Sequence, residues 1–255
     1  MVGLRNLALG GNVVALGLAR HPRRVAAYVN ANLFLWKTLA GARGLPQMTV
    51  FEALGVAPQP LDVTLHPRWP LWFQPEAWLT ADLVNLCVVC RAVQPKVVFE
   101  IGTSIGYTSL HFALNSPPET KIYTLDLPPE RSASLATTWM DQDMIHSHSR
   151  EYLFRQESAG EKVTTLYGDS ATFDFGPYRQ AVDLFFIDGA HSYEYVKNDT
   201  EKALDCVRPG GVIAWHDYGR AGTNGVSRYL EELAHEQGRP VRSLVGSTIA
   251  LLRVQ

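Results

Sequence analysis

Two acidic and two imidazole side chains follow two apolar runs of the sequence, at the point where each run ends. Asp188 and His191 come after one run, and His216 and Asp217 come after the next. If both runs are neighbouring parallel strands, these side chains share one edge of a sheet. Carboxylate oxygens and imidazole nitrogens suit a divalent cation, and a free imidazole can act as a general base near neutral pH. We therefore expect a metal site with an adjacent base.

A second group of candidates surrounds a glycine-bearing turn. Gly102 and Gly106 flank Ser104, so the turn lacks the middle glycine of the dinucleotide fingerprint G-x-G-x-x-G. Gly102 permits a tight turn and a close approach of the backbone to a ligand. The acid before the turn, Glu100, suits a ligand with a cationic part better than a pyrophosphate. The candidate ligand-binding residues of the turn are Glu100, Gly102, Thr103, Ser104, Gly106 and Tyr107.

Two more acids follow apolar runs. Asp126 comes twenty residues after Gly106, which matches the place where an acid commonly accepts hydrogen bonds from ribose hydroxyls. A turn or capping role is the alternative for Asp126. Asp169 and Ser170 could recognise the edge of an adenine ring, or Asp169 could cap a short helix. Both roles of Asp169 can hold at once.

The elements that position these residues alternate along the chain. Apolar runs predict strands at 97–101, 122–125, 163–166, 182–187, 212–215, 241–244 and 248–252. The intervening segments predict helices at about 80–93, 106–115, 192–207 and 224–237. This order predicts an α/β fold with a doubly wound, mostly parallel seven-stranded sheet. The last two strands are too close for a helical crossover, so we expect them to form an antiparallel edge hairpin.

The first 79 residues form a predicted extension to a catalytic domain of residues 80–255. Apolar residues at helical spacing predict helices within 13–19 and 25–39. The apolar face of the second helix must be buried, either on the catalytic domain or in a homo-oligomer. Residues 56–75 are rich in proline with interleaved aromatics, which indicates an extended connection whose aromatics pack on the surface or line a substrate pocket.

Composition limits the partners and the compartment. The net charge of −2 gives no basic surplus for a nucleic acid. We find no apolar stretch long enough to span a membrane, and Gly10 and Gly11 interrupt the apolar start that a signal peptide would need. Three cysteines without framework spacing fit a reducing compartment, so we expect a cytoplasmic protein. Cys87 and Cys90 lie in an apolar predicted helix and are interpreted as structural.

The turn from Glu100 to Gly106 resembles the first motif of class I S-adenosylmethionine-dependent methyltransferases. The joined pattern from 183 to 218 is similar to one branch of that superfamily, the small-molecule O-methyltransferases. That branch includes metal-dependent enzymes that act on sugar hydroxyls of natural products, and the pattern also resembles cephalosporin-hydroxylase-like proteins. The resemblance covers about residues 80–255.

The resemblance implies S-adenosyl-L-methionine as the cofactor and assigns a part of it to each strand end. Glu100 and Gly102 would hold its methionine end. Asp126 would bind the ribose, and Asp169 with Ser170 the adenine.

The resemblance also implies a divalent metal such as Mg²⁺ on Asp188 and Asp217, with His191 as the general base. Relatives of this kind often carry an acid where this chain has His216. Imidazole can still ligate a metal, but it suits Mg²⁺ less well than a carboxylate does.

The implied reaction is an in-line attack of a small-molecule hydroxyl on the sulfonium methyl group. The acceptor stays open among sugars, phenols and amino-acid-derived scaffolds, and the long segment 128–160 could form a lid that shapes its pocket. An NAD-dependent oxidoreductase is disfavoured by the missing glycine and the acid at position 100. A non-catalytic nucleoside-binding protein is disfavoured by the intact set of Asp188, His191 and Asp217. A hydrolase lacks its G-x-S-x-G elbow.

Overall fold

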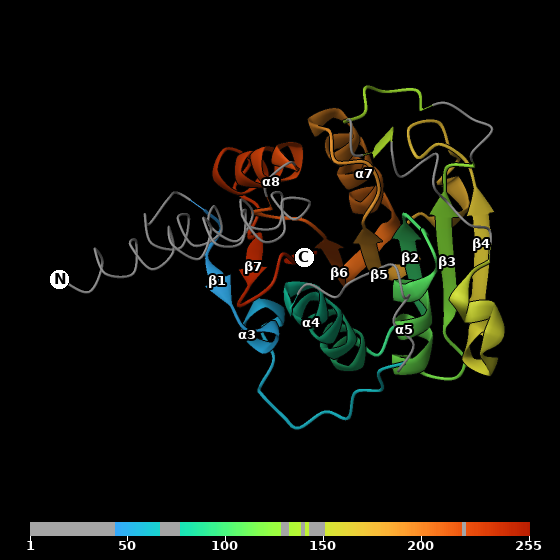
Figure 1. Ribbon diagram of the computed structural model, residues 1–255. Coiled ribbons are helices and arrows are strands. Elements are labelled where there is room, and N and C mark those ends of the chain that lie inside the picture. The colour runs from blue at the N-terminus through green and yellow to red at the C-terminus, as the bar shows by residue number, and fades with distance from the viewer. Residues whose placement is uncertain (1–43, 67–76, 129–132, 139–140, 143–150, 221–222) are drawn as a thin grey trace, which may run out of the picture.

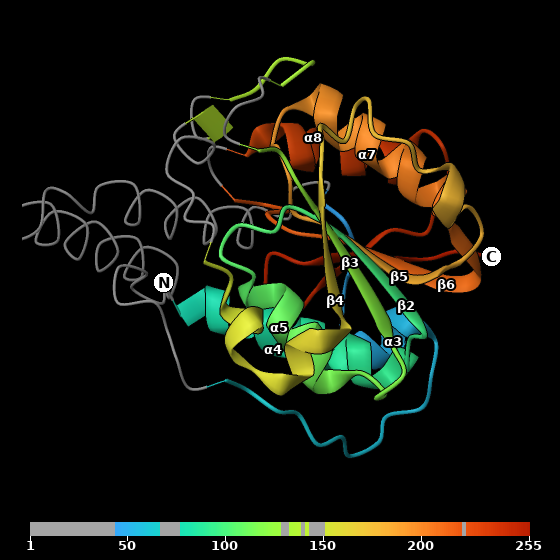
Figure 2. The ribbon, with the colours of Figure 1, turned by 90° about the vertical axis from the view of Figure 1, so that its right-hand side faces the viewer.

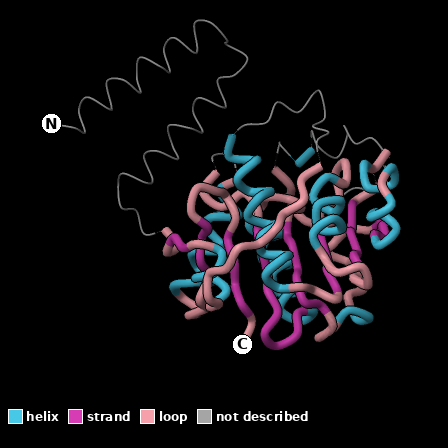
Figure 3. Tube along the Cα trace, turned by 90° about the horizontal axis from the view of Figure 1, so that it is seen from below, coloured by secondary structure: helices cyan, strands magenta, loops and turns pink. Residues whose placement is uncertain are grey.

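The computed structural model describes residues 44–66, 77–128, 133–138, 141–142, 151–220 and 223–255. Within these residues the strands form one eight-stranded sheet in the order β1-β7-β8-β6-β5-β2-β3-β4, seen as one continuous series in Figure 3. The strands are β1 (Gln47–Met48), β2 (Val97–Ile101), β3 (Lys121–Asp126), β4 (Val163–Tyr167), β5 (Val182–Ile187), β6 (Val207–Trp215), β7 (Arg242–Leu244) and β8 (Ala250–Arg253).

The sheet is mostly parallel, as predicted. Strands β6, β5, β2, β3 and β4 pair in parallel, and β8 pairs antiparallel with both β6 and β7. The helices are α3 (Val50–Leu54), α4 (Ala77–Val93), α5 (Tyr107–Asn115), α7 (Tyr193–Cys206) and α8 (Asn224–His235). Helices α3, α4 and α5 cover one face of the sheet and α7 and α8 the other (Figures 1 and 2). The doubly wound α/β fold is therefore confirmed.

The central strand β5 shows why the sheet is covered on both faces. Its side chains alternate between the two sides of the sheet. Leu184 and Phe186 belong to the core beneath α4 and α5, whereas Phe185 and Ile187 belong to the core beneath α7 and α8. All four are apolar and buried, so neither face of this strand can be left to solvent.

The sheet contains one strand more than the seven predicted. Strand β1 pairs in parallel with β7, and it comes from the part of the chain that we assigned to the extension. Leu45 and Val50 from the same region are buried in the core. Strand β6 begins at Val207, five residues before the predicted start. The helices predicted within 13–19 and 25–39 lie outside the described residues, and the boundary at residue 79 stays a prediction.

The connection after α3 has no helix or strand over residues 56–66, as expected for its proline content. It is held on α5 by side chains of that helix. Asn115 accepts a hydrogen bond from the backbone N–H of Thr64 (2.8 Å) and donates to the Thr64 carbonyl (2.8 Å). His111 Nε2 accepts from the N–H of His66 (3.0 Å). The aromatic residues at 69–73, which we expect to pack on the surface or line a pocket, lie outside the described residues.

Cys87 and Cys90 are buried in α4 as free thiols, in agreement with the structural interpretation. Burial raises the pKa of both thiols to about 12, so the reactive thiolate is scarce at neutral pH. Among the described residues, no helix combines the length and the apolarity that crossing a membrane requires.

Candidate functional site

The candidate site lies where the parallel strands β6, β5, β2, β3 and β4 end, because their following loops meet at one edge of the sheet. A pocket opens between these loops. The predicted site residues that line it are Gly102, Ser104, Asp126, Asp169, Ser170 and Asp188. The predicted residues Glu100, Thr103, Gly106 and Tyr107 are not among its lining residues.

Gly102 joins the turn after β2 to the loop after β5. Its backbone has φ +98°, and a β-carbon at this position would lie 2.0 Å from the backbone oxygen of Asp188. The Asp188 N–H in turn donates to the carbonyl of Ile101 (2.9 Å). Only glycine fits this close approach, so the predicted tight turn is present, and its contact partner is the β5 loop.

Glu100 lies beneath the turn rather than in the pocket. Its carboxyl group is fully buried and accepts hydrogen bonds from Ser109 and from Thr124 (2.6 Å). Thr103 shares a hydrogen bond with Thr124 (2.7 Å). Burial raises the pKa of Glu100 to about 8, although the two hydroxyl groups act in the opposite direction. The structure therefore places Glu100 and Thr103 in a buried network that supports the turn.

Gly106 and Tyr107 start α5. Gly106 precedes the helix in the left-handed conformation, with φ +74°, and a β-carbon there would lie 2.5 Å from the ring of Phe154. Tyr107 packs against the ring of His111 with centroids 4.4 Å apart. Both residues thus contact structural neighbours on the α5 side of the turn.

Asp126 forms a pocket wall at the end of β3. Its carboxylate accepts the N–H of Leu127 (3.0 Å). Burial raises the pKa of Asp126 to about 6, against the lowering effect of backbone hydrogen bonds. A half-buried carboxylate on a pocket wall is a suitable acceptor for a pair of ligand hydroxyls.

Asp169, at the end of β4, is already engaged by three donors. It accepts hydrogen bonds from the N–H of Ser134 (2.6 Å), the N–H of Ala171 (2.9 Å) and the hydroxyl of Tyr195 (3.0 Å). Burial raises its pKa, but these hydrogen bonds outweigh it and the pKa lies below the usual value. Asp169 therefore fixes part of the segment 128–160, and its neighbour Ser170 lines the same pocket.

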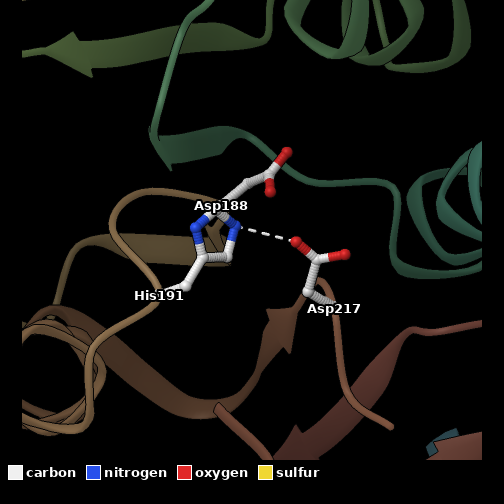
Figure 4. A group of neighbouring side chains, drawn as sticks. All are labelled: Asp188, His191 and Asp217. Carbon is white, nitrogen blue, oxygen red and sulfur yellow. Dashed lines mark ion pairs between the residues drawn. The ribbon is translucent and has the colours of Figure 1, made fainter. Parts of the chain in front are cut away.

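His191 lies between two carboxylates. Its Nδ1 is 2.5 Å from Asp141 Oδ1, and its Nε2 is 2.8 Å from Asp217 Oδ2. Figure 4 shows the second of these ion pairs, with Asp188 beside it. Burial lowers the pKa of His191, but the two carboxylates raise it to about 10. Both nitrogens of the expected free imidazole are therefore paired with carboxylates in this structure.

His216 contacts three carboxylates, and 13% of its side chain is exposed. Its Nδ1 lies 3.1 Å from Asp188 Oδ1 and 3.3 Å from Asp217 Oδ1, and its Nε2 lies 3.3 Å from Asp82 Oδ2. Burial opposes protonation, but these acids hold the pKa of His216 well above its usual value. The surrounding acids therefore favour the protonated form of His216.

Asp188, His191, His216 and Asp217 form one cluster, and its carboxylate oxygens and imidazole nitrogens suit a divalent cation. Asp188, His191 and Asp217 each offer a ligand atom, and these atoms lie within 4.8 Å of one another. The Asp188 carboxylate is 29% exposed, so the group opens toward the pocket. Two carboxylates with one imidazole fit Mg²⁺, Mn²⁺ or a softer ion. The set predicted from sequence was Asp188, His216 and Asp217, and the geometric group contains His191 in place of His216.

Two buried acids of the cluster escaped the sequence analysis. Asp82 accepts hydrogen bonds from the N–H (2.6 Å) and hydroxyl (2.9 Å) of Thr248, besides its contact with His216. Asp82 is the one acid in the apolar sequence of α4, and that isolation is a signal that could have found it. Asp141 lies in a helical turn before β4, and its spacing from Thr138, which it caps, is the signal that could have found it.

The segment 128–160 reaches the site with its described residues. Ala133, Thr137 and Asp141 line the pocket. Further along, Tyr152 and Phe154 are buried against Leu110 of α5. Trp139, His146 and His148 of this segment lie outside the described residues, and the predicted lid stays a prediction.

Comparison with known proteins gives a consistent result. Residues 99–218 match a family described as a methyltransferase domain. A caffeoyl-CoA O-methyltransferase of Stellaria longipes is 27% identical over 152 residues, which cover 57% of this chain and 55% of that protein. The uncharacterised protein y4gI of Sinorhizobium fredii is 26% identical over 178 residues, which cover 65% of this chain but 18% of that protein. The chain thus spans about half the length of the first relative and less of the second.

The fold also has solved counterparts. The crystal structure of the methyltransferase PaMTH1 of Podospora anserina, bound to S-adenosylhomocysteine, superposes with a TM-score of 0.52. The two chains are 18% identical, and the match covers 68% of this chain and 78% of that one. At this identity the likeness establishes the shared fold.

The contact at Gly102 gives a test of the site's architecture. Gly102→Ala should lower the free energy of unfolding by about 1–3 kcal/mol more than Gly246→Ala, because it adds a clash with the β5 loop. Gly246 is the matched control, since it also has a positive φ (+71°) but open space around it; there we expect only the cost of the left-handed backbone, about 1–2 kcal/mol. Urea unfolding measures both, and equal losses would contradict the proposed close approach.

Proposed function

We propose that this chain, which matches a methyltransferase-domain family over residues 99–218, is an S-adenosylmethionine-dependent O-methyltransferase for a small-molecule hydroxyl. One observation carries the proposal: Asp188 lies both in the wall of the pocket and in the acid–imidazole cluster. A cofactor in the pocket and an acceptor at the cluster would therefore be neighbours. Methyl transfer needs this proximity, because alignment of the two reacting atoms supplies much of the rate.

The pocket walls support a nucleoside cofactor. The carboxylate of Asp126 can accept hydrogen bonds from two ribose hydroxyls, and Ser170 lies on the next strand end, where the adenine would bind. Asp169 would contribute mainly through the segment it holds, since Ser134, Ala171 and Tyr195 already donate to it. Gly102 and Ser104 would face the methionine part. Glu100 would support this part from beneath.

Asp126 gives the most direct test of cofactor binding. Because the pKa of its carboxyl is about 6, the Asp126 carboxylate is ionised above pH 6. It becomes protonated, and loses acceptor strength, as the pH falls below 6. We expect S-adenosylhomocysteine to bind more weakly at pH 5 than at pH 7.5. Asp126→Asn should bind about tenfold more weakly at pH 7.5, as for a lost hydrogen bond to a charged group, with a smaller pH dependence.

Calorimetric titration of S-adenosylhomocysteine at both pH values measures this effect. Asp205→Asn is the matched control, because Asp205 is an exposed acid paired with Arg179 on the surface. If Asp126→Asn kept the affinity and pH profile of the wild type, the ribose assignment would be wrong.

The acceptor would bind beside the cluster. Asp188 and Asp217 are the residues that would hold a divalent cation. Such a cation would lower the pKa of an acceptor hydroxyl and offset the negative charge near His191. His191 would take the hydroxyl proton at Nε2, the nitrogen that lies on the Asp217 side. His216, paired with Asp82, would stay in place as a positive charge beside the acids.

The relative from Stellaria longipes is named for caffeoyl-CoA, so a phenolic hydroxyl is one acceptor class to test, beside the sugar and natural-product hydroxyls expected from the sequence. We also propose a cytoplasmic protein without a nucleic-acid partner, which forms homo-oligomers through the helices predicted in residues 1–79. Light scattering of the full chain tests the last point.

The base role of His191 predicts a separation of binding from turnover. His191→Asn should lower turnover by about 10²–10⁴-fold and leave the dissociation constant of S-adenosylhomocysteine within about twofold. Turnover is measured as S-adenosylhomocysteine release with caffeoyl-CoA, catechol and a sugar nucleotide, with and without EDTA. Exposed His235 provides the control His235→Asn. Undiminished turnover in His191→Asn would exclude the base role, and insensitivity to EDTA would exclude the cation.

A further inference from the structure

The Nδ1 side of His191 is held by an acid that does not come from a strand end. Asp141 belongs to a helical turn between β3 and β4, fifty residues before His191 in sequence. Its carboxylate lies 2.5 Å from the ring nitrogen, and the side chains of both residues are buried, with 3% and 7% of their surface exposed. This short buried contact therefore fixes one edge of the imidazole.

Asp141 accepts a hydrogen bond from the backbone of His191 as well as contacting its ring. The N–H of His191 lies 3.2 Å from Asp141 Oδ1 and 3.4 Å from Oδ2. Asp141 is itself fixed, because Thr138 donates its N–H to Oδ2 (2.6 Å) and accepts the N–H of Asp141 at its hydroxyl (3.3 Å). The carboxylate thus has little freedom to rotate, and neither has the imidazole.

We propose that Asp141 is a positioning residue for His191 in the methyl transfer. By accepting a hydrogen bond from Nδ1–H, Asp141 selects the form of the ring whose Nε2 exchanges a proton with the acceptor. The inference rests on the proposed function, in which His191 is the base. An orienting carboxylate on one nitrogen of a catalytic imidazole sets both its tautomer and its direction.

The same segment also contacts the cofactor side of the pocket. Ser134 donates to Asp169, and the N–H of Leu135 donates to the Tyr195 hydroxyl (3.3 Å). Thr137 lines the pocket beside Asp141. The stretch of chain that orients His191 therefore also forms part of the pocket wall. Because Asp141 itself bonds to His191, we expect Asp141 to affect the chemical step more than cofactor affinity.

The test uses the full chain saturated with S-adenosylhomocysteine, and reads the ring nitrogens of His191 by ¹⁵N–¹H NMR, assigned through His191→Asn. In the wild type we expect a strongly deshielded Nδ1 proton. Asp141→Ala should abolish this signal. Asp141→Asn, which keeps the shape and one acceptor oxygen, should retain the proton at a less deshielded position. Asp205→Asn, a surface acid of the same type, should leave it unchanged.

The outcomes separate the positioning role from the proposed function. Failure of the wild type to bind S-adenosylhomocysteine would contradict the proposed function. If Asp141→Asn and Asp141→Ala both bound S-adenosylhomocysteine and showed the Nδ1 proton at the wild-type position, the positioning role would be wrong. With an acceptor from the panel, Asp141→Ala should lower kcat at least about tenfold, with partial rescue in Asp141→Asn and an unchanged KM for S-adenosylmethionine. A change in that KM alone would mean that Asp141 only builds the pocket wall, and would overturn the proposal.

Discussion

The buried carboxylate of Asp217 needs compensation, because an unpaired ion in a protein interior costs several kcal/mol. Both imidazoles and the guanidinium of Arg220 lie within ion-pair distance of it. Burial would raise the pKa of Asp217, but His216 and His191 hold it well below its usual value. Each imidazole in turn needs a second acid, Asp141 for His191 and Asp82 for His216. The cluster is thus an alternating set of charges that only the complete fold assembles.

The glycine turn connects this charge cluster to the pocket. The backbone of Gly102 lies so close to the Asp188 carbonyl that a side chain cannot intervene. The loops after β2 and β5 are therefore held together, and Gly102 and Asp188 line the same pocket. Asp126 and Asp169 complete the pocket from β3 and β4. Adjacent parallel strands make this arrangement possible, since every loop that contributes leaves the sheet at the same edge.

The sequence was sufficient to bring Asp188 and Asp217 together, because each residue follows a strand end. Asp188 and Asp217 come after buried apolar runs, so their proximity follows from the parallel sheet. Asp82 and Asp141 reach the cluster from helix α4 and from a helical turn between β3 and β4, and neither position follows from a strand end. Strand β1 has two residues, too few for an alternation of apolar and polar side chains to appear. The charge state of His191 depends on Asp141, so it could not be predicted without the tertiary contact.

The central claim is that the pocket binds S-adenosylmethionine, and calorimetric titration of its product tests this most directly. S-adenosylhomocysteine should bind the wild type with a micromolar dissociation constant, whereas NAD⁺ should not bind measurably. The titration is repeated with EDTA and with added Mg²⁺ or Mn²⁺, so that any effect of a cation is seen separately. Absence of binding, or tighter binding of NAD⁺, would contradict the account and favour an oxidoreductase.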